Sequence, residues 1–481
     1  MSPSEWNKVL VTSSIRRSNT KNHIIMLCGP KSSGKSTFST LLTNRLLTEP
    51  GAQKSGVAFL DLDPGQPEYT TPGQLSLMHI LVPNFAPPFC HANIARSKNS
   101  VIHSHFVGTI TPSGDSDYYK KCLLDLLARY RNLLKSIASC PLIINTPGWI
   151  QGTGLELLVG IIKMARPTDI IYMSDEGPRD VVDTLVKAAG KTSVVTLPSQ
   201  AKDYMTRTAA NLRTMQMMSY FHQAQDASLW NVLPLSSRSP LEITYAGPKQ
   251  GILGILCLGE QPPADLLKDI IDGNLVAIVS YNQVTPRNDI SKTTITQITT
   301  SGAEQDFISF SAISDGDDAV FEEVQIPFYE NVIRTPEMLP YIDCESSSLP
   351  APHGLNCHGM ALIRGIDISR QKLQILTPLS ETKVRDLINE GSQIILMSGK
   401  LDTPGWAYTE ELNRRDALRK QKSDDNKVIG KGNNDISHSM DVHESIKSFE
   451  QGPWIEKLSG DGGRGVENRT WRVRRDLGKS A

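Results

Sequence analysis

A glycine-rich segment near the start of the sequence has residue types and a spacing that suit phosphate chemistry. Residues 29–37 read GPKSSGKST, which matches the G-x-x-x-x-G-K-[S/T] pattern of phosphate-binding loops. Glycines let the backbone wrap so that its N–H groups point at phosphate oxygens, and the start of a helix adds positive potential there. The pattern predicts ATP and Mg²⁺ as cofactors, with Lys35 reaching the terminal phosphates and Ser36 binding the metal ion. The predicted nucleotide-binding residues are Gly29, Pro30, Lys31, Ser32, Ser33, Gly34, Lys35, Ser36 and Thr37.

Two carboxylates stand at the end of a second apolar run. Residues 59–67 read FLDLDPGQP, so Asp61 and Asp63 lie two positions apart and share one face of an extended strand. In an open α/β sheet, ligands bind beyond the carboxyl ends of the strands. A helix cap or a solvated loop is the alternative for such acidic residues. Beside a phosphate loop, we expect a metal-organising and a proton-accepting group, with Asp61 as a second magnesium ligand.

Short apolar runs alternate with segments of helical periodicity from residue 23 onward, and these elements must position the motifs. The predicted strands are 24–28, 57–61, 103–107, 142–145, 169–173 and 193–196, and the predicted helices are 35–47, 118–137, 155–164, 179–189 and 206–222. Such alternation favours an α/β fold in which helices cover both faces of a parallel sheet. We therefore predict a P-loop NTPase-type parallel sheet, followed by a smaller β-rich C-terminal domain.

Composition shifts divide the chain into five predicted segments. Residues 1–22 read as a polar N-terminal extension, and residues 23–230 as the phosphate-loop domain. Residues 231–415 are rich in strand-forming runs, whereas residues 416–450 have few apolar side chains and predict disorder. Residues 451–481 regain tryptophans and predict a tail that packs on the β-rich domain.

The overall composition indicates a folded protein inside the cell. The 481 residues carry a formal net charge of −1 and are 39% hydrophobic, which excludes a wholly disordered chain and a globally basic nucleic-acid binder. The 7 cysteines are scattered without the spacing of a disulfide framework. Because no apolar run approaches the roughly 18 residues of a membrane span, and no secretory signal opens the chain, we expect no membrane association.

Four segments occur in an order that is more specific than any one of them: GPKSSGKST (29–37), LDLDPGQPEYTTPGQ (60–74), HFVGTITPSG (105–114) and INTPGWIQGTGLELL (144–158). Together they resemble the polynucleotide 5′-hydroxyl kinase family, over essentially everything from residue 23 onward. Three later segments are similar to its fungal nucleolar branch, which processes pre-ribosomal RNA, rather than to its pre-mRNA cleavage-factor branch. They are GMALIRGID (359–367), GKLDTPGWAYTEEL (399–412) and GGRGVENRTWRVRRDLG (462–478).

The resemblance implies roles for particular residues. Asp63 occupies the position of the family's catalytic aspartate, and Gln66 belongs to the same substrate-binding segment. Thr146, Gly148 and Trp149 match the clasp motif T-x-G-W, in which the tryptophan holds the 5′-terminal nucleotide. Arg207 and Arg213 lie where the family has its lid arginines, near 204–222. The cleavage-factor branch has an R-x-x-x-R pair, whereas Ala209 stands four positions before Arg213 here.

The function implied by the resemblance is transfer of the γ-phosphate of ATP to the 5′-hydroxyl end of RNA during processing of the pre-rRNA internal spacer. It implies a nuclear, nucleolar location and an RNA endonuclease partner. Two alternatives are a small-molecule (nucleoside) kinase with the same phosphate loop and a nucleotide-loaded scaffold in an RNA-processing complex. Members of this branch carry a β-rich domain ahead of the loop, whereas the loop here begins at residue 29, so we expect that domain to be missing.

Overall fold

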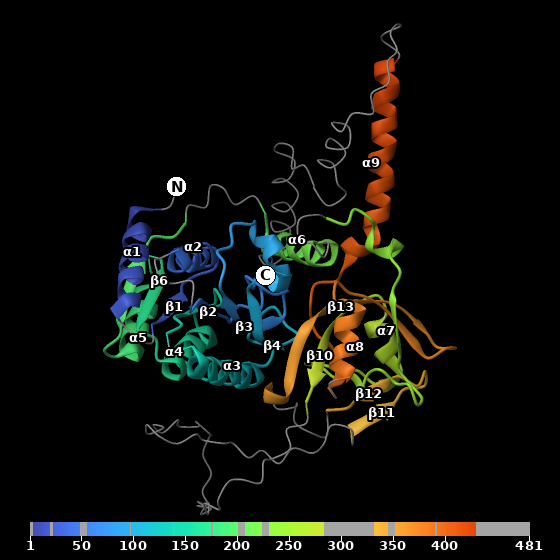
Figure 1. The fold of residues 1–481 in the computed structure, drawn as a ribbon, viewed down its shortest axis with the longest axis horizontal. Coiled ribbons are helices and arrows are strands. Elements are labelled where there is room, and N and C mark those ends of the chain that lie inside the picture. Colours follow the sequence, from blue (N-terminus) through green and yellow to red (C-terminus); the bar gives the residue numbers. More distant parts are fainter. Residues whose placement is uncertain are drawn as a thin grey trace, which may run out of the picture.

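A computed structural model describes most of the chain and arranges it around two sheets (Figure 1). The described residues are 3–19, 23–48, 55–96, 98–137, 139–174, 177–200, 207–223, 230–282, 331–344, 352–389 and 392–429. No helix within these ranges is both long enough and apolar enough to cross a membrane.

The first sheet has seven strands in the order β4-β3-β2-β5-β1-β6-β7. Their bounds are β1 (Ile24–Cys28), β2 (Val57–Asp61), β3 (Gln74–Ile80), β4 (Ser100–Phe106), β5 (Leu142–Asn145), β6 (Asp169–Met173) and β7 (Ser193–Leu197). The run from β2 to β7 is parallel, which confirms the predicted α/β class. At one side of this parallel sheet the structure adds antiparallel pairing, because β3, a strand not predicted from the sequence, runs antiparallel to both β2 and β4. No crossover helix separates β2 from β3, so the chain returns in the opposite direction.

Helices cover both faces of this sheet. One face packs on α3 (Ser116–Ser136), α4 (Thr153–Ala165) and α5 (Arg179–Ala189), and the other on α1 (Ser4–Asn19) and α2 (Lys35–Thr48).

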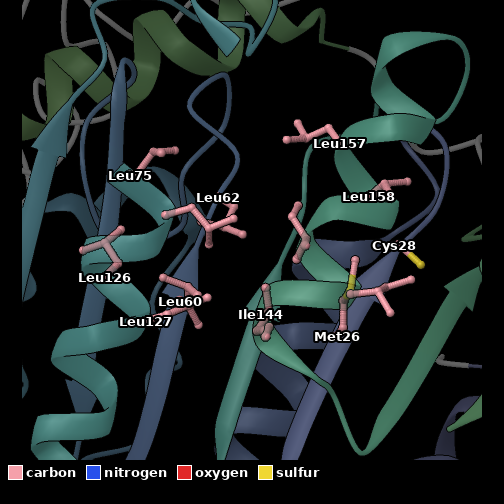
Figure 2. Close-up of a cluster of buried hydrophobic side chains, with 14 of the residues drawn as sticks. Met26, Cys28, Leu60, Leu62, Leu75, Leu126, Leu127, Ile144, Leu157 and Leu158 are labelled. Atoms are coloured by element: carbon pink, nitrogen blue, oxygen red, sulfur yellow. The ribbon is translucent and has the colours of Figure 1, made fainter. Parts of the chain in front are cut away.

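The face of the sheet that packs on α3 and α4 illustrates how apolar periodicity builds the core. Figure 2 shows Leu127 of α3 beside Leu60 of β2, and Leu157 and Leu158 of α4 on the side of Met26 of β1. These side chains are buried and come from one stripe of each helix and one face of the sheet. The sheet edge that carries the candidate site is therefore held by a continuous apolar core.

The predicted polar extension over residues 1–22 contains a helix, α1 (Ser4–Asn19), which packs on the first sheet. Trp6 is 1% exposed, and its ring packs edge-on against Phe38 with centroids 5.4 Å apart. Its indole Nε1 donates a hydrogen bond to the Pro198 carbonyl (2.8 Å). The helix is polar on average, but Trp6 and Leu10 lie one turn apart and face the core.

Replacing Trp6 with alanine is expected to lower the free energy of unfolding by about 3–5 kcal/mol, because a buried aromatic ring leaves a cavity. Nucleotide binding should weaken as well, since a methyl group on Gly34 would lie 2.8 Å from the Trp6 ring, which therefore backs the phosphate loop. Denaturant unfolding and an ATP titration measure the two effects. Val11→Ala, at an exposed site of the same helix, is the control. Equal stability of the two variants would contradict this packing role.

The second sheet confirms the predicted β-rich region after the phosphate-loop domain. Its eight strands follow the order β11-β12-β9-β15-β10-β13-β14-β8. The strands are β8 (Leu241–Thr244), β9 (Gly254–Cys257), β10 (Leu275–Tyr281), β11 (Val332–Arg334), β12 (Pro340–Ile342), β13 (Leu355–Asp367), β14 (Lys372–Leu376) and β15 (Gln393–Ser398). The helices are α6 (Ala209–His222) and α9 (Gly405–Ile429) toward one face, and α7 (Leu267–Ile271) and α8 (Glu381–Asn389) toward the other. The described residues also form the short 3₁₀ helices η2 (Pro88–Arg96), η4 (Leu235–Ser237), η5 (Ala264–Leu266) and η7 (Pro352–Gly354).

A buried cluster joins the two sheets where β13 lies beside β4. His103 Nε2 is 2.8 Å from the Leu355 carbonyl, and His105 Nε2 is 2.8 Å from an oxygen of Asp125. The three side chains His103, His105 and Asp125 could in principle surround a metal ion. The cation Arg129 already contacts the same Asp125 oxygen at 2.7 Å, and burial lowers the pKa of His103 to about 3. These contacts are those of a structural junction with uncharged His103.

The predicted disorder over residues 416–450 is wrong for its first part, because α9 continues to Ile429. Near its start the helix is anchored by buried Glu410, which accepts hydrogen bonds from the Leu235 N–H and the His222 ring. Further along, α9 projects away from both sheets (Figure 1), where an Arg415–Glu411 pair one turn apart supports it. Residues 430–450 and the predicted tail 451–481 lie outside the described residues.

Candidate active site

The ends of three neighbouring parallel strands bring the sequence motifs to one edge of the first sheet. β5 lies between β1 and β2 and pairs with both. The phosphate loop follows β1, and the 146–149 segment follows β5. Asp61 is the last residue of β2, and Asp63 lies two positions beyond it. Because carboxyl ends of parallel strands meet at one edge, motifs far apart in the sequence become neighbours.

The phosphate loop has the backbone that its glycines were expected to permit. Gly29 and Gly34 have φ values of +141° and +100°, which disfavour residues with a side chain. A Cβ on Gly29 would also lie 3.0 Å from the Met173 backbone of β6. The loop therefore packs against the sheet too closely for any residue but glycine at this position.

Lys35 begins α2 and folds back over its own loop. Its Nζ donates hydrogen bonds to the carbonyls of Gly29 (3.0 Å) and Pro30 (2.9 Å), and the residue is 7% exposed. Burial lowers the pKa of Lys35, and the negative charge of Asp63 opposes that shift. The two hydrogen bonds thus fix the Lys35 ammonium group at the centre of the loop.

Asp63 presents one carboxylate oxygen to the site. Oδ1 accepts hydrogen bonds from the N–H groups of Gly65 (3.0 Å) and Gln66 (3.3 Å). Within the described ranges, Oδ2 has no hydrogen-bond partner, and the side chain is half-buried. Burial raises the pKa of Asp63, while the Lys35 charge lowers it. Half-buried Gln66 lies in the same turn, so a substrate hydroxyl could approach Asp63 there.

Asp61 is different, because both of its oxygens are used within the protein. Oδ1 accepts from the Asn145 side chain (3.0 Å) and the Asp63 N–H (3.3 Å), and Oδ2 from the Glu68 N–H (2.6 Å). Burial raises the pKa of Asp61 to about 8, although the Glu68 N–H opposes that shift. This geometry is that of a residue that orders the loop carrying Asp63, and its role as a magnesium ligand beside Ser36 stays a prediction.

The 146–149 segment touches the phosphate loop directly. Buried Thr146 donates its hydroxyl hydrogen to the Leu27 carbonyl of β1 (2.8 Å). A Cβ on Gly148 would lie 2.7 Å from the Lys31 Cα, so the two segments are in backbone contact. Trp149 is half-buried and lies over Gly154 in the first turn of α4. The Trp149 ring therefore packs against the start of α4 on one side, but it belongs to none of the four buried hydrophobic clusters of the described residues.

If Trp149 has the clasp role that the resemblance implies, replacing it with alanine is expected to raise KM for RNA while leaving KM for ATP nearly unchanged. Trp149→Phe should be mild, because a smaller π-face remains for stacking. RNA and ATP titrations beside a melting curve separate this role from packing, since loss of a core tryptophan costs about 3–5 kcal/mol. A collapsed melting temperature, or equal damage to both KM values, would show that Trp149 supports the fold instead.

The two predicted lid arginines do not join the other site residues in this structure. Arg207 is exposed just before Thr208, whose side chain caps α6. Arg213, on α6, pairs at 2.6 Å with Asp402, which follows β15 of the second sheet, and the two side chains are 13% and 46% exposed. Among the described residues, no hydrogen bond or ion pair links either arginine to the phosphate loop. Residues 204–206 of the predicted lid lie outside the described ranges.

Sequence reasoning missed three residues that build this site: Asn145, Glu68 and Gln216. Asn145 ends a strand that is otherwise apolar, LIIN, and a polar residue there was a usable signal. Glu68 lies within the 61–70 segment and contacts Asp61, whereas Gln216 contacts the same segment from α6. The positions of these two residues in the sequence do not indicate either contact.

A wrapped phosphate loop between a buried strand and a helix, with a carboxylate at a neighbouring strand end, defines a P-loop nucleotide-binding domain. In agreement, the family described as mRNA cleavage and polyadenylation factor CLP1 P-loop matches residues 29–223. The polynucleotide 5′-hydroxyl-kinase grc3 of Aspergillus oryzae is 37% identical over 490 residues, which cover 97% of this chain and 58% of the relative. The polynucleotide 5′-hydroxyl-kinase GRC3 of Gibberella zeae is 37% identical over 499 residues, which cover 100% of this chain and 64% of that relative.

The chain is thus similar over nearly its whole length to polynucleotide 5′-hydroxyl kinases, and residues 29–223 match the CLP1 P-loop family model. It spans about three fifths of the length of these curated relatives, which are 58% and 64% covered. Among solved structures, the wild-type Clp1p–Pcf11p (454–563) complex has a TM-score of 0.51 at 15% identity, covering 82% of this chain and 78% of that one. That likeness supports the fold alone.

Proposed function

We propose that this protein is an ATP-dependent polynucleotide 5′-hydroxyl kinase that transfers the γ-phosphate of ATP to the 5′-OH end of RNA. The observation that carries the proposal is the pairing of a half-buried Asp63, with Oδ2 available, and the Lys35 cation of an intact phosphate loop. Its kinase relatives, 37% identical over nearly the whole chain, support it.

The proposed reaction needs a proton acceptor and stabilisation of charge. Asp63 takes the proton of the 5′-hydroxyl as that oxygen bonds to the γ-phosphorus and the bond to the β-phosphate oxygen breaks, releasing ADP. Lys35 stabilises negative charge on the phosphoryl group as it moves. If Arg213 leaves Asp402, it could add to that charge stabilisation, as Arg207 could from the start of α6.

The residues present fit a magnesium ion. Ser36 is half-buried in the first turn of α2, and within the described residues its hydroxyl has no hydrogen-bond partner. Hydroxyl and carboxylate oxygens are the ligands that Mg²⁺ prefers, so Ser36 would hold it with Asp61 or Asp63 nearby. When bound, the ion would neutralise charge on the phosphate oxygens.

Trp149 would hold the 5′-terminal base by stacking. Stacking contributes about 1–3 kcal/mol per base and tolerates every base. An enzyme with such a platform recognises the end of a strand rather than its sequence, which suits a kinase that acts on cleavage products.

Incubation with γ-labelled ATP tests the proposal. The acceptors are RNA with a 5′-hydroxyl, the same RNA with a 5′-phosphate, and free nucleosides. Label on the 5′-hydroxyl RNA alone supports the kinase. Label on nucleosides favours a small-molecule kinase, and ATP binding without transfer to any acceptor favours a nucleotide-loaded scaffold.

We further propose that the substrate is pre-rRNA cleaved in its internal spacer, and that the protein acts in the nucleolus. Its expected partner is an endonuclease that leaves a 5′-hydroxyl end. Support comes from the resemblance of the later segments to the nucleolar branch. Localisation of the tagged protein and nuclease activity in its purified complex test these points, and diffuse cytoplasmic signal would contradict them.

A further inference from the structure

The segment from Asp61 to Thr70 is held by three other elements, and the central contact is made by Glu68. We propose that Glu68, through a buried hydrogen bond with His91, is a positioning residue that keeps Asp63 aligned with the phosphate loop. This inference rests on the proposed kinase function, in which Asp63 removes the proton.

Glu68 connects the Asp63 loop to the helix that begins in the phosphate loop. Its N–H donates to Asp61 Oδ2 (2.6 Å), and Asp61 Oδ1 in turn accepts from the Asp63 N–H. Its Oε1 lies 2.9 Å from the hydroxyl of Thr40 on α2, and that hydroxyl is also 2.9 Å from the Ser36 carbonyl. One residue therefore contacts both halves of the candidate site.

The partner of Glu68 is a histidine with both ring nitrogens engaged. His91 Nδ1 lies 2.7 Å from Glu68 Oε1, and Nε2 lies 2.7 Å from the Ala86 carbonyl. The His91 ring therefore bridges the Glu68 carboxyl group and the Ala86 carbonyl, and neither ring nitrogen is left without a polar neighbour. The side chains of His91 and Glu68 are 1% and 3% exposed, and Tyr69 stacks on the His91 ring at 5.9 Å. Removing one partner of such a buried pair leaves the other partner's polar group without its contact, which is destabilising.

A third contact attaches the same segment to α6. Gln216 Nε2 donates to the carbonyls of Pro67 (2.7 Å) and Thr70 (2.9 Å), which flank Glu68. The loop is therefore held by α2 through Thr40, by η2 through His91 and by α6 through Gln216. So many contacts on a loop of irregular backbone suit a requirement for precise placement, because a misplacement of about 1 Å can cost about 10²-fold in rate.

Glu68→Gln tests the proposal, because the amide keeps the size and one acceptor but replaces the carboxyl group that contacts both His91 and Thr40. We expect kcat to fall by about 10- to 100-fold, with KM for ATP nearly unchanged. Thr40→Val, which keeps the contact of Glu68 with His91, should give a smaller loss in the same direction and serves if Glu68→Gln folds poorly. Glu381→Gln, which removes an exposed ion pair on α8, is the matched control and should leave kcat unchanged.

A double variant separates positioning from general stabilisation. If Glu68 acts through Asp63, then Glu68→Gln should add little to the loss already caused by Asp63→Asn. If the kcat of the double variant fell by the full product of the two single losses, and its melting temperature fell as well, the proposal would be overturned.

Amide hydrogen exchange decides the question independently of kinase activity. Glu68→Gln should increase exchange in peptides that cover residues 61–71, while the control variant should not. Unchanged exchange there would refute the positioning role. If the wild-type protein transferred no phosphate to RNA, the proposed function would fail while the exchange result still stood.

Discussion

Lys35→Ala is expected to reduce phosphoryl transfer to RNA by about 10²- to 10³-fold or more, because it removes a cation held at the phosphates. The Nζ group donates to the Gly29 and Pro30 carbonyls, so the charge is already in place before the transition state forms. Initial rates with labelled ATP and 5′-hydroxyl RNA measure the loss.

The burial of Lys35 sets the controls for that measurement. A lysine that is only 7% exposed also contributes to the shape of the loop, so Lys35→Met, which keeps most of the volume, should be compared with Lys35→Ala. Lys31→Ala changes an exposed lysine of the same loop and should have a far smaller effect. Normal turnover in a folded Lys35→Ala protein would refute the assignment of the phosphate loop.

Asp63→Asn is expected to lower kcat by about 10²- to 10⁴-fold, the usual contribution of a positioned general base. The asparagine carbonyl can still accept from Gly65 and Gln66, so the turn should survive, but an amide does not take up the substrate proton. ATP affinity should be roughly retained. Single-turnover rates beside an ATP titration measure the two quantities separately.

Asp61→Asn should reduce kcat less than Asp63→Asn does, and its main effect should be on stability. An asparagine there must turn its NH₂ group toward the donors that now face the carboxylate, namely the N–H of Glu68 or the donors from Asp63 and Asn145. An uncompensated buried donor costs about 1–3 kcal/mol. If Asp61→Asn were the more damaging to kcat at an unchanged melting temperature, the two carboxylates would exchange roles.

Residues that act through local chain geometry were predictable from the sequence. The phosphate loop needs only a strand, a glycine-rich turn and a helix start in succession, and all three lie within residues 24–48. The apolar runs likewise predicted the parallel strands β1, β2, β5 and β6, because strands covered on both faces are apolar along their length. The edge strand β7 was predicted as well, although it is only partly buried.

Elements whose stability depends on partners elsewhere were not predictable in this way. Helix α1 has a polar composition and gains its packing from Phe38 and Pro198. The start of α9 depends on contacts of Glu410 with His222 and Leu235. In both cases tertiary burial outweighed what local composition favours.

The sequence by itself determined that this chain has a phosphate loop, a neighbouring carboxylate pair and a T-x-G-W segment in a fixed order. Only the tertiary structure decided that Asp61 is enclosed by donors while Asp63 keeps one oxygen available, and that Arg213 pairs with Asp402. The physical reason is that a motif specifies side-chain types and local backbone. Burial and hydrogen-bond partners, which set charge and access, come from residues distant in the sequence, as Asn145 is from Asp61.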